Sequence, residues 1–424
     1  MAFQQGLSGL ASASRAIDVT SNNIANASTV GFKSGSTVFA DAYASALTGA
    51  TSNLQVGIGS TVAAVKQSFN QGNLTTTNNP LDMAINGNGF FMIARNDQTV
   101  AYTRNGQFDI NKDGFIITPL GERLMGYQNL DAIGGGIPDA GGTPVPLIIP
   151  PGGIAPQATQ GVLARANLDS REVNPVNLDP PGPAVFDQND PESYNSTTSL
   201  TVYDSLGNNH TLTLYFVRTV DTEDREWDVH YSLDGGDAEL LVDGPLAFDE
   251  FGIMEDLDID GTGIFDIEFD LANGAVTPFE FQLDLRRLTQ FGSSFSVTEL
   301  NQDGYPPGEI AGLSVSKDGI IQGRYTNGQA KNIGQVALAT FRNPNGLTSL
   351  GDNLWAESPD SGQPIHNKPG VGLNGVVNAG MVEESNVDIT QELVALIIQQ
   401  RNYQANAQSI RTQDQILQTM VNLR

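Results

Sequence analysis

Side chains that could support catalysis or metal binding are scattered along this 424-residue chain. The three histidines, His210, His230 and His366, lack the spacing of metal ligands. Cysteine is absent, which excludes thiolate chemistry and disulfide bonds. There is no H-E-x-x-H, G-x-S-x-G or phosphate-loop motif. We therefore expect no catalytic residue, no metal, no cofactor and no enzymatic activity.

The stretch "DLDIDGTGIFDIE" resembles the start of a calcium-binding loop. Asp256, Asp258 and Asp260 stand at its first, third and fifth positions, but Ile267 occupies the twelfth, where a bidentate Glu is required. Apolar and acidic residues alternate from Ile264 onward, which predicts a strand rather than a helix. We favour an acidic turn at an exposed edge over a calcium site.

The stretch "GVGLNG", from Gly370 to Gly375, matches the dinucleotide-binding pattern G-x-G-x-x-G. That loop requires a preceding strand and a helix directly after it. Here "HNKPG" precedes the pattern and "VVNAG" follows it, so we predict a glycine loop without a nucleotide.

The N-terminal segment has the pattern of a helix. Apolar residues recur at intervals of four and three, which predicts a helix over residues 4–27 with an apolar seam. The stretch "SNNIANASTVGFKSG" then lowers helix propensity through its asparagines and offers a stop at Gly31. We predict that the helix ends and the chain turns in this stretch. The seam residues are Phe3, Leu7, Leu10, Ile17 and Ile24.

The C-terminal segment predicts a longer helix that contains neither Gly nor Pro. Asp388 is suited to cap its start, with Gln391 three residues later as in a capping box. The apolar face is broader than a shorter N-terminal helix could cover, so we expect a second copy of the chain to cover the rest. The seam residues are Ile389, Leu393, Leu396, Tyr403, Ala407, Ile410, Leu417 and Val421.

The region between the two helices predicts β-structure. Period-2 alternation is clear around residues 200–216, and Asn327-Gly328 is a strong hairpin signal. Two Lys-Asp-Gly stretches, at 112–114 and 317–319, each read as a turn between strands. The Pro- and Gly-rich stretch 134–153 predicts a domain border, and a second border is expected near 286–296.

We therefore expect an α+β multidomain chain with nested domains. Residues 1–70 and 367–424 would form a terminal helical domain, whose two helices form a coiled coil, with its connecting segment. Residues 71–150 and 291–366 would form a discontinuous β domain, and residues 151–290 a second, acidic β domain inserted into it.

The charge is distributed unevenly along the chain. The formal net charge is −27, and 21 acidic against 3 basic residues lie between Asp221 and Glu299. Such an acidic chain argues against nucleic acid as a partner. The ends are nearly neutral, with 7 acidic and 6 basic residues in 1–70 and 381–424 together. No apolar run suits a signal peptide or a membrane span, so we expect no membrane insertion.

The ends resemble a known protein family. "GLSGLASASRAIDVTSNNIANASTVGFKSG" and "SNVDITQELVALIIQQRNYQANAQSIRTQDQILQTMVNLR" are similar to the terminal signatures of bacterial flagellar rod, hook and hook-associated proteins. "NPLDMAINGNGFFMI" and "YTRNGQFDINKDGFIITPLGERLMGY" resemble β segments of the rod and hook members. The length, the large insertion and the stretches "NQDGYPPGE" and "GDNLWAES" are closest to the hook members.

The resemblance implies a structural subunit of the flagellar hook. Such subunits assemble into a curved tube that acts as a universal joint between motor and filament. Their terminal helices line the channel as a coiled coil, and the inserted domain lies outermost. Expected partners are further copies of the chain, the hook cap, the distal rod, the hook-associated junction proteins and the type III export apparatus. The expected location is the extracellular hook and basal body, reached without a cleaved signal peptide.

The resemblance also implies that the apolar seams of the two helices contact neighbouring subunits. Phe32 would anchor the turn after the first helix against an adjacent subunit or against its own chain. Phe39 and Tyr43 resemble an export signal, with simple packing as the alternative. The interface residues expected are Leu7, Leu10, Ile17, Ile24, Phe32, Ile389, Leu393, Leu396, Tyr403, Ile410, Leu417 and Val421.

Two other functions remain open at this stage. The chain could be another flagellar axial component, such as a distal rod or hook-associated protein. It could also be a secreted β-rich enzyme or carbohydrate binder whose site lies in the acidic middle, although no converging polar groups point to one.

Overall fold

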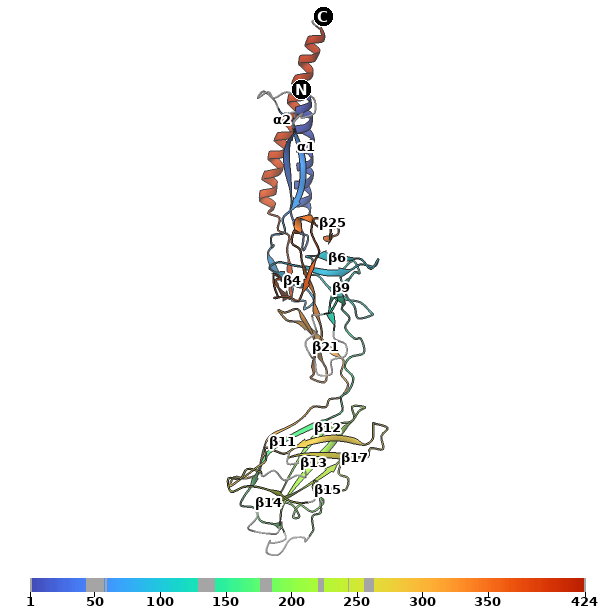
Figure 1. The fold of residues 1–424 in the computed structure, drawn as a ribbon, viewed down its shortest axis with the longest axis vertical. Coiled ribbons are helices and arrows are strands. Elements are labelled where there is room, and N and C mark those ends of the chain that lie inside the picture. The colour runs from blue at the N-terminus through green and yellow to red at the C-terminus, as the bar shows by residue number, and fades with distance from the viewer. Residues whose placement is uncertain are drawn as a thin grey trace. The chain divides into compact units, whose positions relative to one another are not determined.

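The computed structural model describes residues 2–42, 57, 59–128, 142–175, 185–219, 225–242, 244–254 and 263–422 (Figure 1). The described chain is mostly β, with helix α1 (Ala2–Ala25) near its start and helix α2 (Ile389–Asn422) near its end. It divides into two compact units. Unit 1 comprises residues 1–151, 311–324 and 330–424, and unit 2 comprises residues 152–310 and 325–329.

The two helices of unit 1 begin and end where local chemistry dictates. The Asp388 carboxylate accepts hydrogen bonds from the backbone amides of Thr390 and Gln391, at 2.8 and 3.2 Å, which confirms the predicted cap of α2. α1 ends at Ala25, inside the stretch where the sequence predicts its end. The chain then turns through Gly31, whose φ of 73° favours glycine.

The helices pack antiparallel. The side chain of Asn23 donates to Glu392 at 3.0 Å, while Gly9 lies against Asn406 and Gly6 against Ile410. Facing residue numbers therefore sum to 415 or 416, which places the start of α1 level with about residue 414 of α2. The last two turns of α2 continue past the N-terminal end of α1 (Figure 1).

A two-stranded ribbon covers a further side of α1. Strands β1 (Gly35–Ala42) and β2 (Gly59–Gln67) pair antiparallel, and both pack on the helix. The Ser12 hydroxyl donates to the carbonyl of Ser60 at 3.0 Å.

The rest of unit 1 is a 13-stranded sheet with two small ribbons. The ribbons pair β3 (Leu74–Thr76) with β29 (Met381–Glu383) and β4 (Met83–Asn86) with β28 (Val376–Ala379). Each ribbon thus joins a strand from the first part of the chain to one from the last. The sheet contains β5 (Phe90–Ala94), β6 (Val100–Thr103), β7 (Asp109–Ile110), β8 (Ile116–Ile117), β9 (Arg123–Gln128), β10 (Val145–Pro146), β21 (Ile310–Val315), β22 (Ile320–Tyr325), β23 (Ala330–Val336), β24 (Leu338–Thr340), β25 (Thr348–Gly351), β26 (Leu354–Ala356) and β27 (Ile365–Asn367). A short 3₁₀ turn spans Pro344–Gly346.

The predicted hairpins are confirmed. Asn327-Gly328 lies in the turn between β22 and β23, and both Lys-Asp-Gly stretches lie in turns between strands. Gly114 and Gly319 have φ values of 85° and 72°, which explains why glycine ends each of these two turns. An aromatic cluster of edge-to-face pairs around Phe90, Trp355 and Phe341 fills the core of this sheet.

Unit 2 is a sandwich of two five-stranded sheets. The faces are joined by one apolar core, in which Trp227, Phe216 and Leu212 of one sheet meet Leu168 and Leu283 of the other. One sheet contains β12 (Ser196–Tyr203), β13 (Asn209–Arg218), β14 (Glu226–Leu233), β15 (Glu239–Leu240) and β16 (Leu246–Ala247). The other contains β11 (Gly161–Asp169), β17 (Ile264–Phe269), β18 (Phe279–Asp284), β19 (Thr289–Phe291) and β20 (Ser296–Gln302).

Unit 2 extends to Ile310, beyond residue 290 where the sequence places the border. The reason is β20, which pairs antiparallel with β11 from Ser296 to Gln302. A strand that enters a sheet through long-range pairing carries no local signal of the domain to which it belongs.

Candidate functional site

A stripe of small residues on α1 faces α2. A Cβ built on Gly9 would lie 2.8 Å from the Asn406 side chain, and one on Gly6 would lie 2.9 Å from Ile410. Ala13 and Ala16 continue the stripe and are buried. Small residues allow the two helix backbones to approach closely, so the seam within one chain is narrow.

The apolar seam predicted for α1 lies beside this stripe. Leu7, Leu10, Ile17 and Ile24 each directly follow a residue of the helix–helix contact, so they are rotated by about 100° around the axis. Leu7 is exposed, and the other three are half-buried. The fold therefore leaves much of this apolar stripe without a cover from α2.

Some of the contact residues predicted on α2 are covered within the chain, and others are exposed. Ile410 packs at Gly6 within the chain, and Leu396 is half-buried. Leu417 is 52% exposed and lies on the part of α2 that extends past α1. The other exposed members of the predicted set are Ile389, Leu393, Tyr403 and Val421.

The turn after α1 is held by a buried asparagine. The amide of Asn23 exchanges two hydrogen bonds with the backbone of Gly35, at 2.8 and 2.9 Å, and also donates to Glu392 of α2. These bonds tie the end of α1 to the backbone across the turn. Gly35 itself begins β1, and the bend lies at Gly31.

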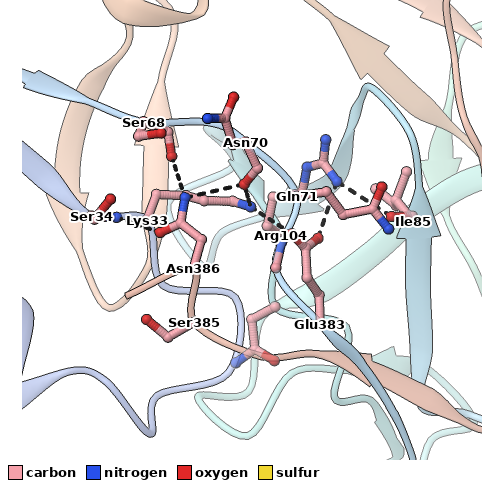
Figure 2. Close-up of polar contacts among 12 residues, drawn as sticks. Lys33, Ser34, Ser68, Asn70, Gln71, Ile85, Arg104, Glu383, Ser385 and Asn386 are labelled. Atoms are coloured by element: carbon pink, nitrogen blue, oxygen red, sulfur yellow. Dashed lines mark hydrogen bonds and ion pairs between the residues drawn. The ribbon is translucent and has the colours of Figure 1, made fainter. Parts of the chain in front are cut away.

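A buried ion cluster joins the turn to the β-structure (Figure 2). The Lys33 ammonium contacts one carboxylate oxygen of Glu383 at 2.5 Å, and Arg104 contacts the other at 3.1 Å. The side chains of Lys33 and Glu383 are 0% exposed. Lys33 follows α1, Glu383 ends β29, and Arg104 follows β6, so three segments distant in sequence meet at one carboxylate.

Backbone groups complete this ion cluster. Lys33 donates to the Asn70 carbonyl at 2.8 Å, Arg104 donates to the Gly87 carbonyl at 2.8 Å, and the Gly72 amide donates to Glu383 at 2.9 Å. Burial lowers the pKa of Lys33 below its ordinary value, and the Glu383 charge opposes this shift. Burial also lowers the pKa of Arg104, and the Glu383 charge again opposes the shift. Partners of this quality are needed to keep two cations charged out of water.

Asn386 links the same junction to the start of α2. Its amide accepts from the Ser34 backbone at 2.8 Å and donates to the carbonyls of Ser68 and Asn70, at 2.7 and 3.1 Å (Figure 2). The segment that leaves α1 and the segment that enters α2 are thus tied to each other three residues before α2 begins.

Sequence reasoning missed these junction residues. Lys33 and Arg104 lie in stretches that resemble the family signatures, and Glu383 lies two residues before another, but their pairing spans up to 350 positions. One sequence signal could have pointed to this pair: Lys33 and Glu383 are among only 13 charged residues in the two nearly neutral ends.

The structure also describes most of the other residues and motifs that the sequence singles out. Phe32 is half-buried and lines a cleft beside the turn. Phe39 lies in β1 and is exposed, whereas Tyr43 lies outside the described residues. Residues 256–262 of the calcium-like stretch are also outside them, and the strand predicted from Ile264 onward is confirmed as β17. "GVGLNG" leads into β28 and not into a helix, so the nucleotide-loop context is missing.

The described residues form neither a metal-binding cluster nor a membrane-spanning helix. They contain no group of three or more His, Asp or Glu side chains placed to hold a metal ion. Among them, neither helix combines the length and hydropathy that a membrane span requires.

Models of four flagellar families match the chain in order. They are a flagella basal body rod protein family (residues 3–33), the flagellar hook protein FlgE/F/G D1 domain (84–158), the flagellar basal body protein FlaE D2 domain (167–305) and the flagellar basal body rod FlgEFG protein C-terminal family (378–423). The first covers α1 except for Ala2, and the last covers all of α2.

Full-length relatives agree with these matches. The chain is 39% identical to the flagellar hook protein FlgE of Salmonella typhimurium, with 100% of each chain covered. It is 38% identical to that of Escherichia coli over the same coverage, and 31% identical to that of Borreliella burgdorferi over 99% of this chain and 98% of the relative. The chain belongs to the flagellar hook protein family. The resemblance that the terminal signatures indicated is therefore confirmed.

A solved structure shares the fold. The crystal structure of Helicobacter pylori flagellar hook protein FlgE2 matches with a TM-score of 0.50 at 15% identity, covering 72% of this chain and 99% of that chain. At this identity the match speaks for the hook-protein fold alone.

Proposed function

We propose that this chain is a structural subunit of the bacterial flagellar hook that polymerises with copies of itself into a curved tube acting as a universal joint. Membership of the hook protein family supports this role, because full-length relatives bear that name. Its place would be the extracellular hook next to the basal body, reached through the type III export apparatus. Partners at the ends of the tube would be the hook cap, the distal rod and the hook-associated junction proteins.

The observation that carries the proposal is the uncovered apolar surface of the helix pair. Single exposed apolar residues are common, but here Leu7, Leu393 and Leu417 belong to stripes that run along two packed helices. A coiled coil between copies would remove these stripes from water. The terminal helices would form the inner tube, the discontinuous β domain a middle shell, and the inserted acidic domain the outside.

Leu417→Asp tests this role. Leu417 lies past the end of α1, so the substitution leaves the intrachain seam intact and places a charge only where a second copy would pack. Burying an unpaired charge there should cost about 3 kcal/mol and raise the critical concentration for polymerisation about a hundredfold. The measurements are sedimentation and negative-stain microscopy.

Gln415→Asp is the matched control, because it adds the same charge half a turn away on an exposed polar position. Circular dichroism should show folded β-structure in both variants. Normal tubes from Leu417→Asp would contradict the proposed seam. Ile410→Asp should also prevent polymerisation, but it disturbs the contact with Gly6 as well.

A further inference from the structure

A cleft of about 420 Å³ lies in unit 1 beside the turn that follows α1. It is formed by the second half of α1, strand β2 and the turn between β25 and β26. Its lining combines apolar and acidic groups, namely Val19, Phe32, Val65, Trp355, Asp18 and Asp352.

The walls of this cleft are held in place. Trp355 donates its indole N–H to Gln67 at 2.6 Å, and Asn353 donates to the carbonyl of Val30 at 3.0 Å. Asp352 and Asn353 have φ values of 53° and 58°, a conformation that Asp and Asn tolerate better than most residues. The turn that carries Asp352 is therefore fixed against the segment that leaves α1.

The two carboxylates of the cleft are not neutralised. Asp18 and Asp352 are exposed, and neither forms an ion pair within the described part of the chain. Arg15 precedes Asp18 by one helical turn but makes no ion pair with it either. The only cation lining the cleft among the described residues is Lys33, which is buried and already paired with Glu383.

Each copy of the chain carries on α2 a cation unpaired among the described residues, Arg401, whose charge is opposite to that of these two carboxylates. Arg401 is nine residues from both Glu392 and Ile410, which contact α1, so its side chain points away from that contact by about half a turn. It is exposed and makes no ion pair in the described residues. Val394 and Ile398, which are 54% and 51% exposed, flank it on the same face.

We propose that Arg401 of a second copy of this chain enters the cleft and pairs with Asp18 and Asp352. The methylene stem of an arginine suits the apolar lining, and its planar guanidinium suits two carboxylates. This assignment rests on the proposed polymerisation and names one contact that it would use. Arg411 suits the cleft less well, since Gln404 and Gln408 stand at the same-face positions that Val394 and Ile398 occupy relative to Arg401.

Arg401 and the cleft lie at different heights along the helix axis. Arg401 is level with about residue 14 of its own α1, whereas the cleft is lined by residues between 18 and 26, at the end of α1 and directly after it. When the copies run parallel, as in the proposed tube, the 1.5 Å rise per residue requires a second copy to be displaced along the helix axis by about 6–18 Å. Such a contact is heterologous, and repeated it produces an open helical assembly rather than a closed dimer.

The test is a charge exchange in the full-length chain. Asp18→Lys and Arg401→Glu should each raise the critical concentration for polymerisation about tenfold, and the double variant should return it to within about threefold of wild type. Arg411→Glu is the matched control and should change it less than threefold. Sedimentation gives the critical concentration, and circular dichroism checks that each chain is folded.

The outcomes separate this inference from the proposed function. If wild type and Arg411→Glu do not polymerise, the proposed function fails. If they polymerise and Arg401→Glu does so equally well, the assigned contact is wrong. If both single variants are impaired and the double variant is not rescued, the pairing of Arg401 with this cleft is also wrong.

Discussion

At the scale of single residues, the junction depends on one carboxylate. Glu383 satisfies Lys33, Arg104 and the amide of Gly72 at once, and the Glu383 backbone carbonyl accepts from Gly31 at 2.7 Å. A buried ion pair is a poor source of net stability, but removing one partner is costly because the other charge stays out of water. The cluster therefore determines which segments meet here more than how tightly they hold.

Glu383→Gln should destabilise unit 1 strongly. The substitution keeps the volume but leaves two buried cations without a counter-ion, which costs about 3–5 kcal/mol. Calorimetry or urea unfolding should show this loss in unit 1 and leave the transition of unit 2 unchanged. Glu384→Gln, at the exposed neighbouring position, should have little effect. Equal stabilities of the two variants would refute the importance of the cluster.

His210 makes the stability of unit 2 depend on pH. It is 2.6 Å from Asp234 and 3.4 Å from Asp204. Burial lowers the pKa of His210, but its bonds to these two carboxylates outweigh burial and raise the pKa above its ordinary value. The protonated form is thus favoured in the folded state. Its stabilisation is fully present below about pH 6.5 and is lost as the pH rises through the raised folded value.

The urea midpoint of unit 2 should therefore be lower at pH 9 than at pH 6.5. In His210→Gln this difference should disappear, because the variant has no group to titrate there. His230 does not interfere, since burial lowers its pKa and places its effect below this range. A wild-type midpoint that stays constant over the range would contradict the argument.

At the scale of elements, α1 presents different surfaces to different neighbours. Its small residues contact α2, Ser12 contacts the ribbon of β1 and β2, and its larger apolar residues stay partly uncovered. A close helix pair with large residues beside the seam presents one broad apolar surface. Such a surface suits a coiled coil of many copies better than a two-helix coil.

Gly9→Val should separate the two helices. A side chain there meets Asn406 at less than 3 Å, and its Cβ branch cannot turn away from α2. Overpacking of this kind costs about 1–3 kcal/mol. The helical signal in circular dichroism should melt at lower temperature than in Ala11→Val, which places the same side chain on the exposed side of α1. Identical melting of both variants would show that the close contact is unimportant.

At the scale of the whole molecule, the two units differ strongly in net charge. Unit 2 contains 30 acidic and 6 basic residues, a net charge of −24, whereas unit 1 contains 18 acidic and 15 basic residues, a net charge of −3. Copies of unit 1 can therefore pack closely, while copies of unit 2 repel one another. We propose that the ends supply stiffness and that the acidic unit allows neighbouring copies to slide.

Removing unit 2 tests this division. Ile154 and Gly308 pair antiparallel, with an N–H···O distance of 2.8 Å, so the chain enters and leaves unit 2 side by side. Replacing residues 154–308 by a short Gly-Ser turn should close this gap and leave unit 1 folded. Tubes should still form, and their bending should change, as measured by electron microscopy and motility of complemented cells. Complete loss of tubes would refute the division.

Sequence patterns were enough to predict the helices at both ends, the hairpins at Asn327-Gly328 and Lys-Asp-Gly, and the family. These features rest on local periodicity, on turn chemistry and on contiguous signatures, all of which are readable within a few tens of residues. Tertiary structure alone decided that Glu383 meets Lys33, that β20 belongs to unit 2, and that glycines rather than leucines form the seam with α2. The physical reason is shared by all three. Each depends on which distant surface a residue faces, and a 100° rotation of a helix or one long-range strand pairing changes that answer without changing any local pattern.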